Sequence, residues 1–499
     1  MIRPSASVGI SERGGFHQEA SPFSVRSRRT VTHLATASSP DHPVPEPWNN
    51  RSMPADLAYD DPSSDVLLDP ATGVRRSILP GGVRLLTQRD RSVRSATIGL
   101  WLPVGSRDET PAHAGSTHVL EHLLFKGTRR RSAMDIAAAF DEVGGDSNAV
   151  TAKEHTLYYG RVRSSDLPMA VDVLTDMITA SVLAEDALAT EREVILEELA
   201  MAEDDPGDIG YETFLADVLG PDTPIGRPVG GTAGSVEALT IEDVRDHFAE
   251  HYRPDNLVVT AVGDLDHEEL AGMLQAGLRR GGWELAADAV PERRPRAAHP
   301  GPASAGLLTA PADVASLTPH RLSRPTEQNH IYLGGHGLTA LSEDRHALSV
   351  LMSILGGGMS SRLFQNIREE RGLAYSVYSF SAGYRDAGLF GMYAACRPGR
   401  TTQVVELLAE ELSRMGEQGI DELELARAKG QITGSFALGL EDTSSRMGRL
   451  GTIELVHGRY TSVDETLARI GAVGIGDVSA LASRLASSFS TRVEVGPDS

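Results

Sequence analysis

One arrangement of expected strands and helices occurs twice along this chain of 499 residues, on either side of a stretch rich in proline and alanine. In each half, alternating apolar residues predict strands first, and apolar residues at helical spacing predict helices after them. The two series start about 250 residues apart, and a unit of that length can bury its own hydrophobic core. The sequence therefore predicts two similar domains rather than a solenoid of short repeats.

The order of elements within each half indicates the fold class. Strands followed by helices favour an α+β architecture, in which helices pack on a mixed or antiparallel sheet to form an α/β sandwich. We place the two homologous domains at residues 67–284 and 327–495. Residues 285–326 have no periodicity and many prolines, which predicts a linker. Residues 1–66 are rich in Ser, Pro and Arg, which predicts a disordered tail.

The tail and the apolar content bear on location. The arginines of residues 1–66 are compatible with a transit peptide, although Glu12 and Glu19 argue against it, and a start codon placed too far upstream is the other alternative. No apolar leader and no run of about 18 apolar residues is found, so we expect a cytoplasmic protein without a membrane partner.

Charge and cysteine content exclude further classes. The 47 Lys and Arg are outnumbered by 69 Asp and Glu, and the resulting net charge of −22 argues against nucleic acid as a partner. The single cysteine, Cys396, excludes an intrachain disulfide and a cysteine-rich metal cluster. A bound metal would therefore need histidine and carboxylate ligands.

The segment His118-Val119-Leu120-Glu121-His122 lies in the first expected helix. Because a helix turns once every 3.6 residues, the two histidines lie on one face and can reach one metal ion, with Glu121 beside them. This is the H-x-x-E-H pattern of certain zinc peptidases. Chance gives roughly 0.03 such patterns in a chain of this composition. The alternative is a helix whose polar face happens to carry two histidines.

A catalytic zinc site needs a third protein ligand. The expected helix at residues 184–203 carries Glu191, Glu193, Glu197 and Glu198. Glu191 and Glu198 are two turns apart on one face beside the buried side, where carboxylates need a partner. The alternative is an ordinary solvated acidic face, which is the expected state of Glu193 and Glu197.

Together these motifs resemble the M16, or pitrilysin, family of zinc metallopeptidases. The resemblance rests on residues 118–128 (HVLEHLLFKGT), Gly144-Gly145 with Asn148-Ala149, residues 154–156 (EHT) and residues 191–198 (EREVILEE). It extends from about residue 70 to about residue 490. The length resembles the mitochondrial processing peptidase-like subfamily, whose bacterial members are two-domain chains. This implies two domains that form half of a clamshell.

The resemblance implies a role for each residue of the motif. Zinc would be held by His118, His122 and Glu198, because the step of 76 residues between the last two matches the family's spacing. Glu121 would be the general base and proton shuttle. Glu191 would orient a ligand or a proton transfer, as an outer-sphere residue.

The resemblance also implies substrate contacts in the first half. Residues 147–162 are expected to form a strand, and Asn148 and Ala149 lie at its start. In the family such an edge strand receives the substrate by β-addition, which pairs with an extended backbone. For Asn148 the alternative is a turn residue after Gly145.

The second half lacks the zinc motif but carries two others. The repeat places Leu351, Ile354 and Leu355 at the positions of the motif. The run Gly356-Gly357-Gly358 resembles the family's glycine-rich loop near the substrate, with a tight turn as the alternative.

Arg368 and Tyr375 match an Arg and Tyr that face the zinc from the opposite half of the clamshell, where Tyr375 would stabilise an oxyanion. The alternative is an exposed helix Arg with a half-buried strand Tyr. A two-domain chain must receive this pair from another subunit. A homodimer is therefore implied, or a heterodimer with a degenerate homologue.

The expected function is that of a zinc-dependent endopeptidase, with one zinc ion per chain, that hydrolyses peptides or unfolded protein segments in a closed chamber. The main alternative is a non-catalytic structural or assembly subunit of the same fold. A zinc hydrolase on an unrelated fold is a further alternative, which the Glu191 and Glu198 pair and the repeated second half disfavour.

Overall fold

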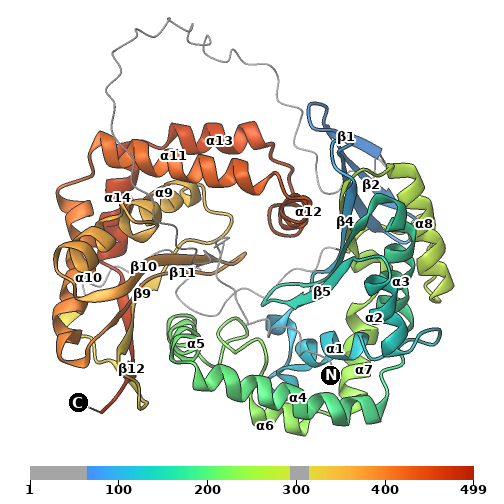
Figure 1. Cartoon of the computed structure of the whole chain (residues 1–499), viewed down its shortest axis with the longest axis horizontal. Helices are drawn as coiled ribbons and strands as arrows, with labels where there is room; N and C mark the ends of the chain where they lie inside the picture. The colour runs from blue at the N-terminus through green and yellow to red at the C-terminus, as the bar shows by residue number, and fades with distance from the viewer. Residues whose placement is uncertain (1–64, 293–313, 499) are drawn as a thin grey trace, which may run out of the picture.

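The computed structural model describes residues 65–292 and 314–498. In these ranges the chain forms two mixed sheets with helices packed on them, and this confirms the predicted fold class (Figure 1). The N-terminal sheet has the order β1-β2-β3-β7-β4-β6-β5. Its strands are β1 (Asp65–Asp69), β2 (Val74–Leu79), β3 (Val83–Arg89), β4 (Ser95–Leu102), β5 (Asp146–Thr151), β6 (Thr156–Arg163) and β7 (Val258–Gly263). Only β3 and β7 of this sheet pair in parallel in the described ranges.

Most helices of the first half cover the outer face of this sheet. The helices of the first half are α1 (Ser116–Leu124), α2 (Ala133–Asp141), α3 (Leu167–Ala180), α4 (Glu185–Asp204), α5 (Pro206–Leu219), α6 (Ala233–Ala238), α7 (Ile241–His251) and α8 (His267–Arg280). The main core lies between the sheet and α1, α3 and α8, where residues such as Leu100, Leu120 and Leu174 are fully buried. No helix of the described ranges is long and apolar enough to cross a bilayer.

The second half repeats this plan. Its sheet has the order β10-β11-β9-β12-β8, which matches β5-β6-β4-β7-β3, and again one pair, β8 with β12, is parallel. The strands are β8 (His320–Ser323), β9 (Asn329–His336), β10 (Ala374–Gly383), β11 (Gly388–Cys396) and β12 (Phe489–Gly496). The helices are α9 (Arg345–Gly356), the π-helical turn η7 (Phe364–Glu370), α10 (Thr401–Glu417), α11 (Glu422–Gly439), α12 (Thr443–Thr452), the π-helical turn η9 (Ile453–His457), α13 (Val463–Ala472) and α14 (Ile475–Ala486).

Each half also lends a helix to the other. Helix α5 packs on β9 and β12, where Phe214 is buried against Tyr332. Helix α12 packs on β4 and β7, where Met447 and Leu450 are buried with Trp101. The two helices occupy corresponding places in the repeated element order, so the exchange is reciprocal (Figure 1). Each sheet therefore has its inner face covered by the opposite half of the chain.

Three expectations differ from the structure. The single strand expected at residues 147–162 is the hairpin of β5 and β6, because the polar turn at residues 152–155 reverses the chain. Strand β8 lies inside the predicted linker. It was not predicted because it has only four residues and these do not alternate between apolar and polar. Strand β1 begins two residues before the predicted end of the tail, where its pairing with β2 orders it. The rest of the predicted tail, residues 1–64, and residues 293–313 of the linker lie outside the described residues.

Candidate metal centre

Helix α1 is held at its first turn by a buried carboxylate. Glu109 accepts hydrogen bonds from the backbone N–H groups of Gly115 and Thr117, at 2.8 and 2.7 Å. Burial raises the pKa of Glu109 to about 7, although these same bonds favour its charged form. Gly115 has φ +94°, and a side chain there would meet the backbone oxygen of Gly230 at 2.8 Å. The start of the helix is thus fixed against its surroundings.

Three side chains from two helices converge beside α1. His118 and His122 lie one turn apart on α1, and Glu198 reaches them from α4. One ligand atom from each lies within 4.8 Å of the other two. The Oε2 atom of Glu198 is 3.8 Å from Nε2 of His118 and 3.6 Å from Nε2 of His122. The structure therefore brings together the three residues that the sequence proposes as ligands.

The donor set and its spacing fit a zinc ion. Two ligand atoms held about 2.1 Å from one zinc ion at a tetrahedral angle lie about 3.4 Å apart, close to the separations found. The buried His118 ring has no hydrogen bond to any described residue, and its Nδ1 has no partner. Burial, with a smaller effect from His122, lowers the pKa of His118 to about 3. The imidazole is therefore neutral, as a metal ligand must be.

Glu191 fixes the orientation of His122. Its buried carboxylate lies 3.2 Å from Nδ1 of His122 and 2.6 Å from Nζ of Lys126. Burial alone would raise the pKa of Glu191, but the hydrogen bonds from His122 and Lys126 outweigh it and lower that pKa. A carboxylate at Nδ1 holds the proton on that nitrogen and leaves Nε2 free to face Glu198. Glu191 thus lies against a proposed ligand, which is where the orienting role implied by the resemblance would place it.

Glu121 lies beside the three residues, in a half-buried position. The hydroxyl of Thr151, on β5, donates a hydrogen bond to its carboxylate. Burial raises the pKa of Glu121, and the charge of Glu198 adds to this, while Thr151 and His122 act in the opposite direction. A carboxylate with a raised pKa accepts a proton more readily than an ordinary one, as a general base must.

Strand β5 is the last strand of its sheet, next to α1. Asn148 and Ala149 lie within this strand, so the turn suggested as an alternative for Asn148 is not found. The Asn148 side chain accepts a hydrogen bond from the N–H of Ala149 at 2.8 Å. An edge strand presents unpaired backbone groups to which a further strand can bind.

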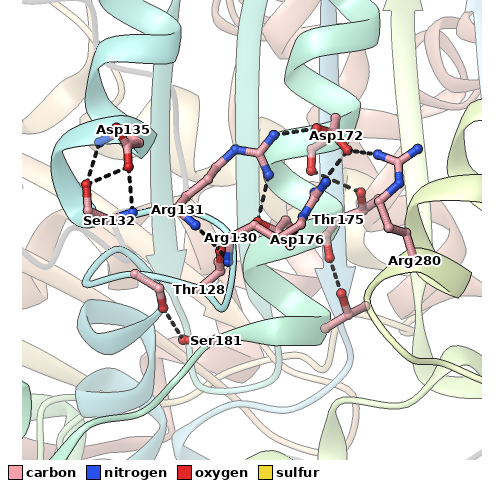
Figure 2. Close-up of polar contacts among 12 residues, drawn as sticks. Thr128, Arg130, Arg131, Ser132, Asp135, Asp172, Thr175, Asp176, Ser181 and Arg280 are labelled. Carbon is pink, nitrogen blue, oxygen red and sulfur yellow. Dashed lines mark hydrogen bonds and ion pairs between the residues drawn. The ribbon is translucent and has the colours of Figure 1, made fainter.

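The loop after α1 is anchored by ion pairs, as Figure 2 shows. Thr128 donates to Asp176 at 2.6 Å, and Arg130 and Arg131 pair with the same carboxylate at 2.9 and 2.7 Å. Asp172, one turn earlier on α3, also pairs with Arg130 at 3.1 Å. The loop that follows α1 is therefore bound to α3, as the start of α1 is bound to Glu109.

Comparison with family models identifies this architecture. The model described as Insulinase (Peptidase family M16) matches residues 84–232, which contain the three converging side chains. The model described as Peptidase M16 inactive domain matches residues 238–432. The chain belongs to the M16 peptidase family.

Relatives in M16 cover most of the chain. An uncharacterized zinc protease of Streptomyces coelicolor is 49% identical over 82% of this chain and 86% of its own length. An uncharacterized zinc protease of Mycobacterium tuberculosis is 44% identical over 86% of this chain and 95% of its own length. Among solved structures, the peptidase M16 inactive domain from Pseudomonas fluorescens has a TM-score of 0.75 at 19% identity, over 85% of this chain and 98% of that one. A protease from Helicobacter pylori has a TM-score of 0.72 at 21% identity, over 85% and 99%. These two structures share the fold.

The Arg and Tyr expected to act in M16 catalysis lie in the second half. The Arg368 guanidinium is 4.1 Å from the centroid of the Tyr375 ring and donates to the backbone oxygen of Tyr375 at 2.9 Å. The Tyr375 side chain is 72% exposed. Within the described residues neither contacts the three converging side chains, so one chain alone does not bring this pair to the candidate metal centre.

The glycine run of this M16 chain ends α9 and packs tightly. A Cβ atom on Gly356 would lie 2.3 Å from the backbone nitrogen of Ser379, and one on Gly358 would lie 2.9 Å from the side chain of Gln431. Gln431 also donates to the backbone oxygen of Gly357 at 2.8 Å. Close packing therefore gives at least two of these glycines a structural reason, independent of any substrate.

Sequence reasoning missed three residues around the centre. Lys126 lies one turn after His122, and that spacing is a signal that could have shown its approach to Glu191. Thr151 reaches α1 from a strand and lies 30 positions after Glu121, and Glu109 reaches α1 from the residue that follows a 3₁₀ turn at Ser106–Asp108. No local pattern reports such contacts, because they depend on how the elements pack.

A buried ion-pair cluster joins the two halves near the β5–β6 turn. Arg107 lies 2.5 Å from Glu154, which is in that turn, and 3.0 Å from Asp386, which is in the turn between β10 and β11. The Arg107 side chain is 4% exposed. In the sequence, Glu154 belongs to residues 154–156, which contribute to the resemblance to M16. In the structure, its ion pair with Arg107 helps to hold the second half to the first.

Proposed function

We propose that this M16 chain is a zinc-dependent endopeptidase that hydrolyses peptides or unfolded protein segments. The proposal is carried by one observation: ligand atoms of His118, His122 and Glu198 lie within 4.8 Å of one another beside the half-buried carboxylate of Glu121. Similar chains from several bacteria carry the name zinc protease, which supports the same activity.

Each residue of the centre then has a task. His118, His122 and Glu198 would hold a zinc ion, which would supply Lewis acidity toward the scissile carbonyl and the attacking water. Glu121 takes a proton from that water and delivers it to the leaving amine. Glu191 keeps the Nε2 lone pair of His122 directed at the centre. The free edge of β5, with Asn148 and Ala149, binds the substrate backbone as an added strand.

The test combines metal analysis with cleavage of a mixed peptide library. We expect one zinc ion per chain, cleavage that a chelator stops, and loss of cleavage with retained zinc in Glu121→Gln. His118, His122 and Glu198 substitutions should lose zinc, whereas Glu197→Gln, an exposed neighbour on α4, should keep it. A zinc-loaded wild-type chain that cleaves no peptide would favour the non-catalytic subunit instead.

We further propose that the active form is a homodimer with a closed chamber between the subunits. Tyr375 is exposed on the half without ligands and Arg368 is stacked on it, so the pair is available to the centre of a second subunit. A heterodimer with a degenerate homologue would use the same surface.

Co-expression tests the shared site. A Glu121→Gln chain and a Tyr375→Phe chain, each nearly inactive alone, should recover activity together. Half of randomly formed dimers would be mixed, and each mixed dimer would have one intact site, so about a quarter of wild-type activity is expected. If mixed dimers form and activity stays absent, the proposed sharing of Tyr375 between subunits is wrong.

A further inference from the structure

A cavity of about 480 Å³ lies between the inner face of the N-terminal sheet and helices α11 and α12 of the second half. Its walls are mostly apolar, with Trp101 and Leu157 from the sheet and Phe436 and Leu440 from the second half. Every ionisable side chain in its lining, so far as the chain is described, is an arginine or a histidine. We call it the basic cavity. Its volume is in the range that holds a small ligand or a short peptide segment.

Among the described residues, the two arginines of the basic cavity form no ion pair with an acidic side chain. Arg345 donates to a backbone oxygen at 3.1 Å, and Arg449 also donates to a backbone oxygen. Glu465 is the acidic group whose charge acts on Arg345, but it already pairs with Arg469. The chain has 69 acidic and 47 basic residues. Two cations that have no acidic partner in the described part of it, and that line an apolar cavity, mark a place for an anion.

His346, which also lines the basic cavity, supports an anion site there. Burial, and then the positive charges of Arg345 and Arg469 with His457, lower the pKa of His346 to about 4. The Nε2 atom of His346 is buried and has no hydrogen-bond partner among the described residues. An anion in the basic cavity would offset the repulsion among these groups and give Nε2 a partner.

The basic cavity reaches the free edge of the N-terminal sheet. Val150 lines it and is 41% exposed, whereas its neighbours Ala149 and Thr151 are buried. Thr151 points to Glu121 on α1, so Val150 points to the opposite face. A segment that pairs with β5 would therefore direct alternate side chains toward α1 and toward the basic cavity.

We propose that the basic cavity is a substrate subsite that binds an acidic side chain of a peptide segment paired with β5. This inference rests on the proposed peptidase function and adds a substrate class to it, namely peptides with a carboxylate on a side chain that faces away from α1. Glutamate fits best, because its methylene groups can contact the apolar walls while its carboxylate reaches Arg345 or Arg449.

Binding to a zinc-loaded, full-length Glu121→Gln chain tests the inference without needing catalysis. Labelled peptides that differ only in Glu or Gln at one position, moved stepwise along the peptide, are compared by fluorescence anisotropy. At one position the Glu peptide should bind about tenfold more tightly than its Gln partner. Arg345→Gln and Arg449→Gln should each remove most of this preference. Arg427→Gln removes one positive charge from the exposed face of α11, and this variant should keep the preference for the Glu peptide.

Thermal unfolding checks that the three arginine variants are equally folded. The inference is wrong if Glu and Gln peptides bind equally at every position, or if the preference survives loss of both cavity arginines, even when zinc-dependent cleavage is observed. Decanoate that binds the basic cavity without displacing the Glu peptide would also overturn it. A preference that disappears with the arginines would support it, even if the wild-type chain cleaved nothing.

Discussion

The bond between Glu191 and His122 makes a quantitative prediction about zinc affinity. Glu191 is buried and holds two donors, Nδ1 of His122 at 3.2 Å and Nζ of Lys126 at 2.6 Å. Removing its carboxylate leaves the His122 ring free to rotate and to change tautomer. The zinc complex should therefore weaken although no ligand has been changed.

The size of the effect follows from these two contacts. Loss of the carboxylate behind a metal-bound histidine weakens metal binding about 10- to 100-fold, which is about 1.4–2.7 kcal/mol. The Lys126 side chain is 37% exposed, so water can replace the carboxylate as the partner of its ammonium group. Loss of this ion pair should therefore contribute little to the weakening of zinc binding. A Gln side chain can still accept the proton of His122. We therefore expect the Kd for zinc to rise about tenfold in Glu191→Gln and about 100-fold in Glu191→Ala.

Competition with a chromophoric zinc chelator measures these Kd values at one pH. Glu197→Gln, exposed on the same helix, is the control for a lost carboxylate, and Lys126→Met isolates the ammonium group. If folded Glu191→Ala binds zinc as tightly as the wild type, the bond does not prepare His122 and the reasoning is refuted.

Three further predictions concern stability, measured by urea unfolding. Arg107→Ala removes the buried guanidinium that pairs with Glu154 and Asp386, and should cost about 3–5 kcal/mol. An effect below about 1 kcal/mol would contradict this. In the folded state Glu109 keeps its proton up to about pH 7, whereas in the unfolded state it releases that proton near pH 4.5. The free energy of unfolding should therefore fall by about 3 kcal/mol as the pH rises from about 4.5 to about 7. Glu109→Gln should remove that decline. A Cβ atom at Gly451 would lie 2.3 Å from an indole ring of the first sheet, so Gly451→Ala should cost about 1–3 kcal/mol, while Gly448→Ala on the same helix has open space and should cost nothing.

The approach of His118, His122 and Glu121 could be predicted from sequence because it depends on one helix turn. The choice of Glu198 over Glu197 needed the family resemblance, since adjacent residues on a helix differ by direction and only the packing of α4 on α1 decides which faces inward. In the structure Glu198 points to the histidines and Glu197 is exposed. The turn within residues 147–162 was missed because the alternation continues across it.

The contacts that complete the centre and the fold could not be predicted in this way. Thr151 meets Glu121 only after β5 has joined the sheet, and the sheet in turn is covered by α12, which comes about 290 residues later along the chain. Amphipathic spacing shows that α5 and α12 each have an apolar face. It does not say against which sheet that face packs.

The reciprocal exchange of α5 and α12 has a consequence for the origin of the chain. A single ancestral copy of the repeat would have left the inner face of its sheet bare, whereas two copies that traded this helix across a two-fold axis would have covered both faces. Gene duplication and fusion then turn a swapped dimer into one polypeptide without disturbing its packing. The halves should accordingly be insoluble when expressed apart and should reassemble when expressed together as separate chains.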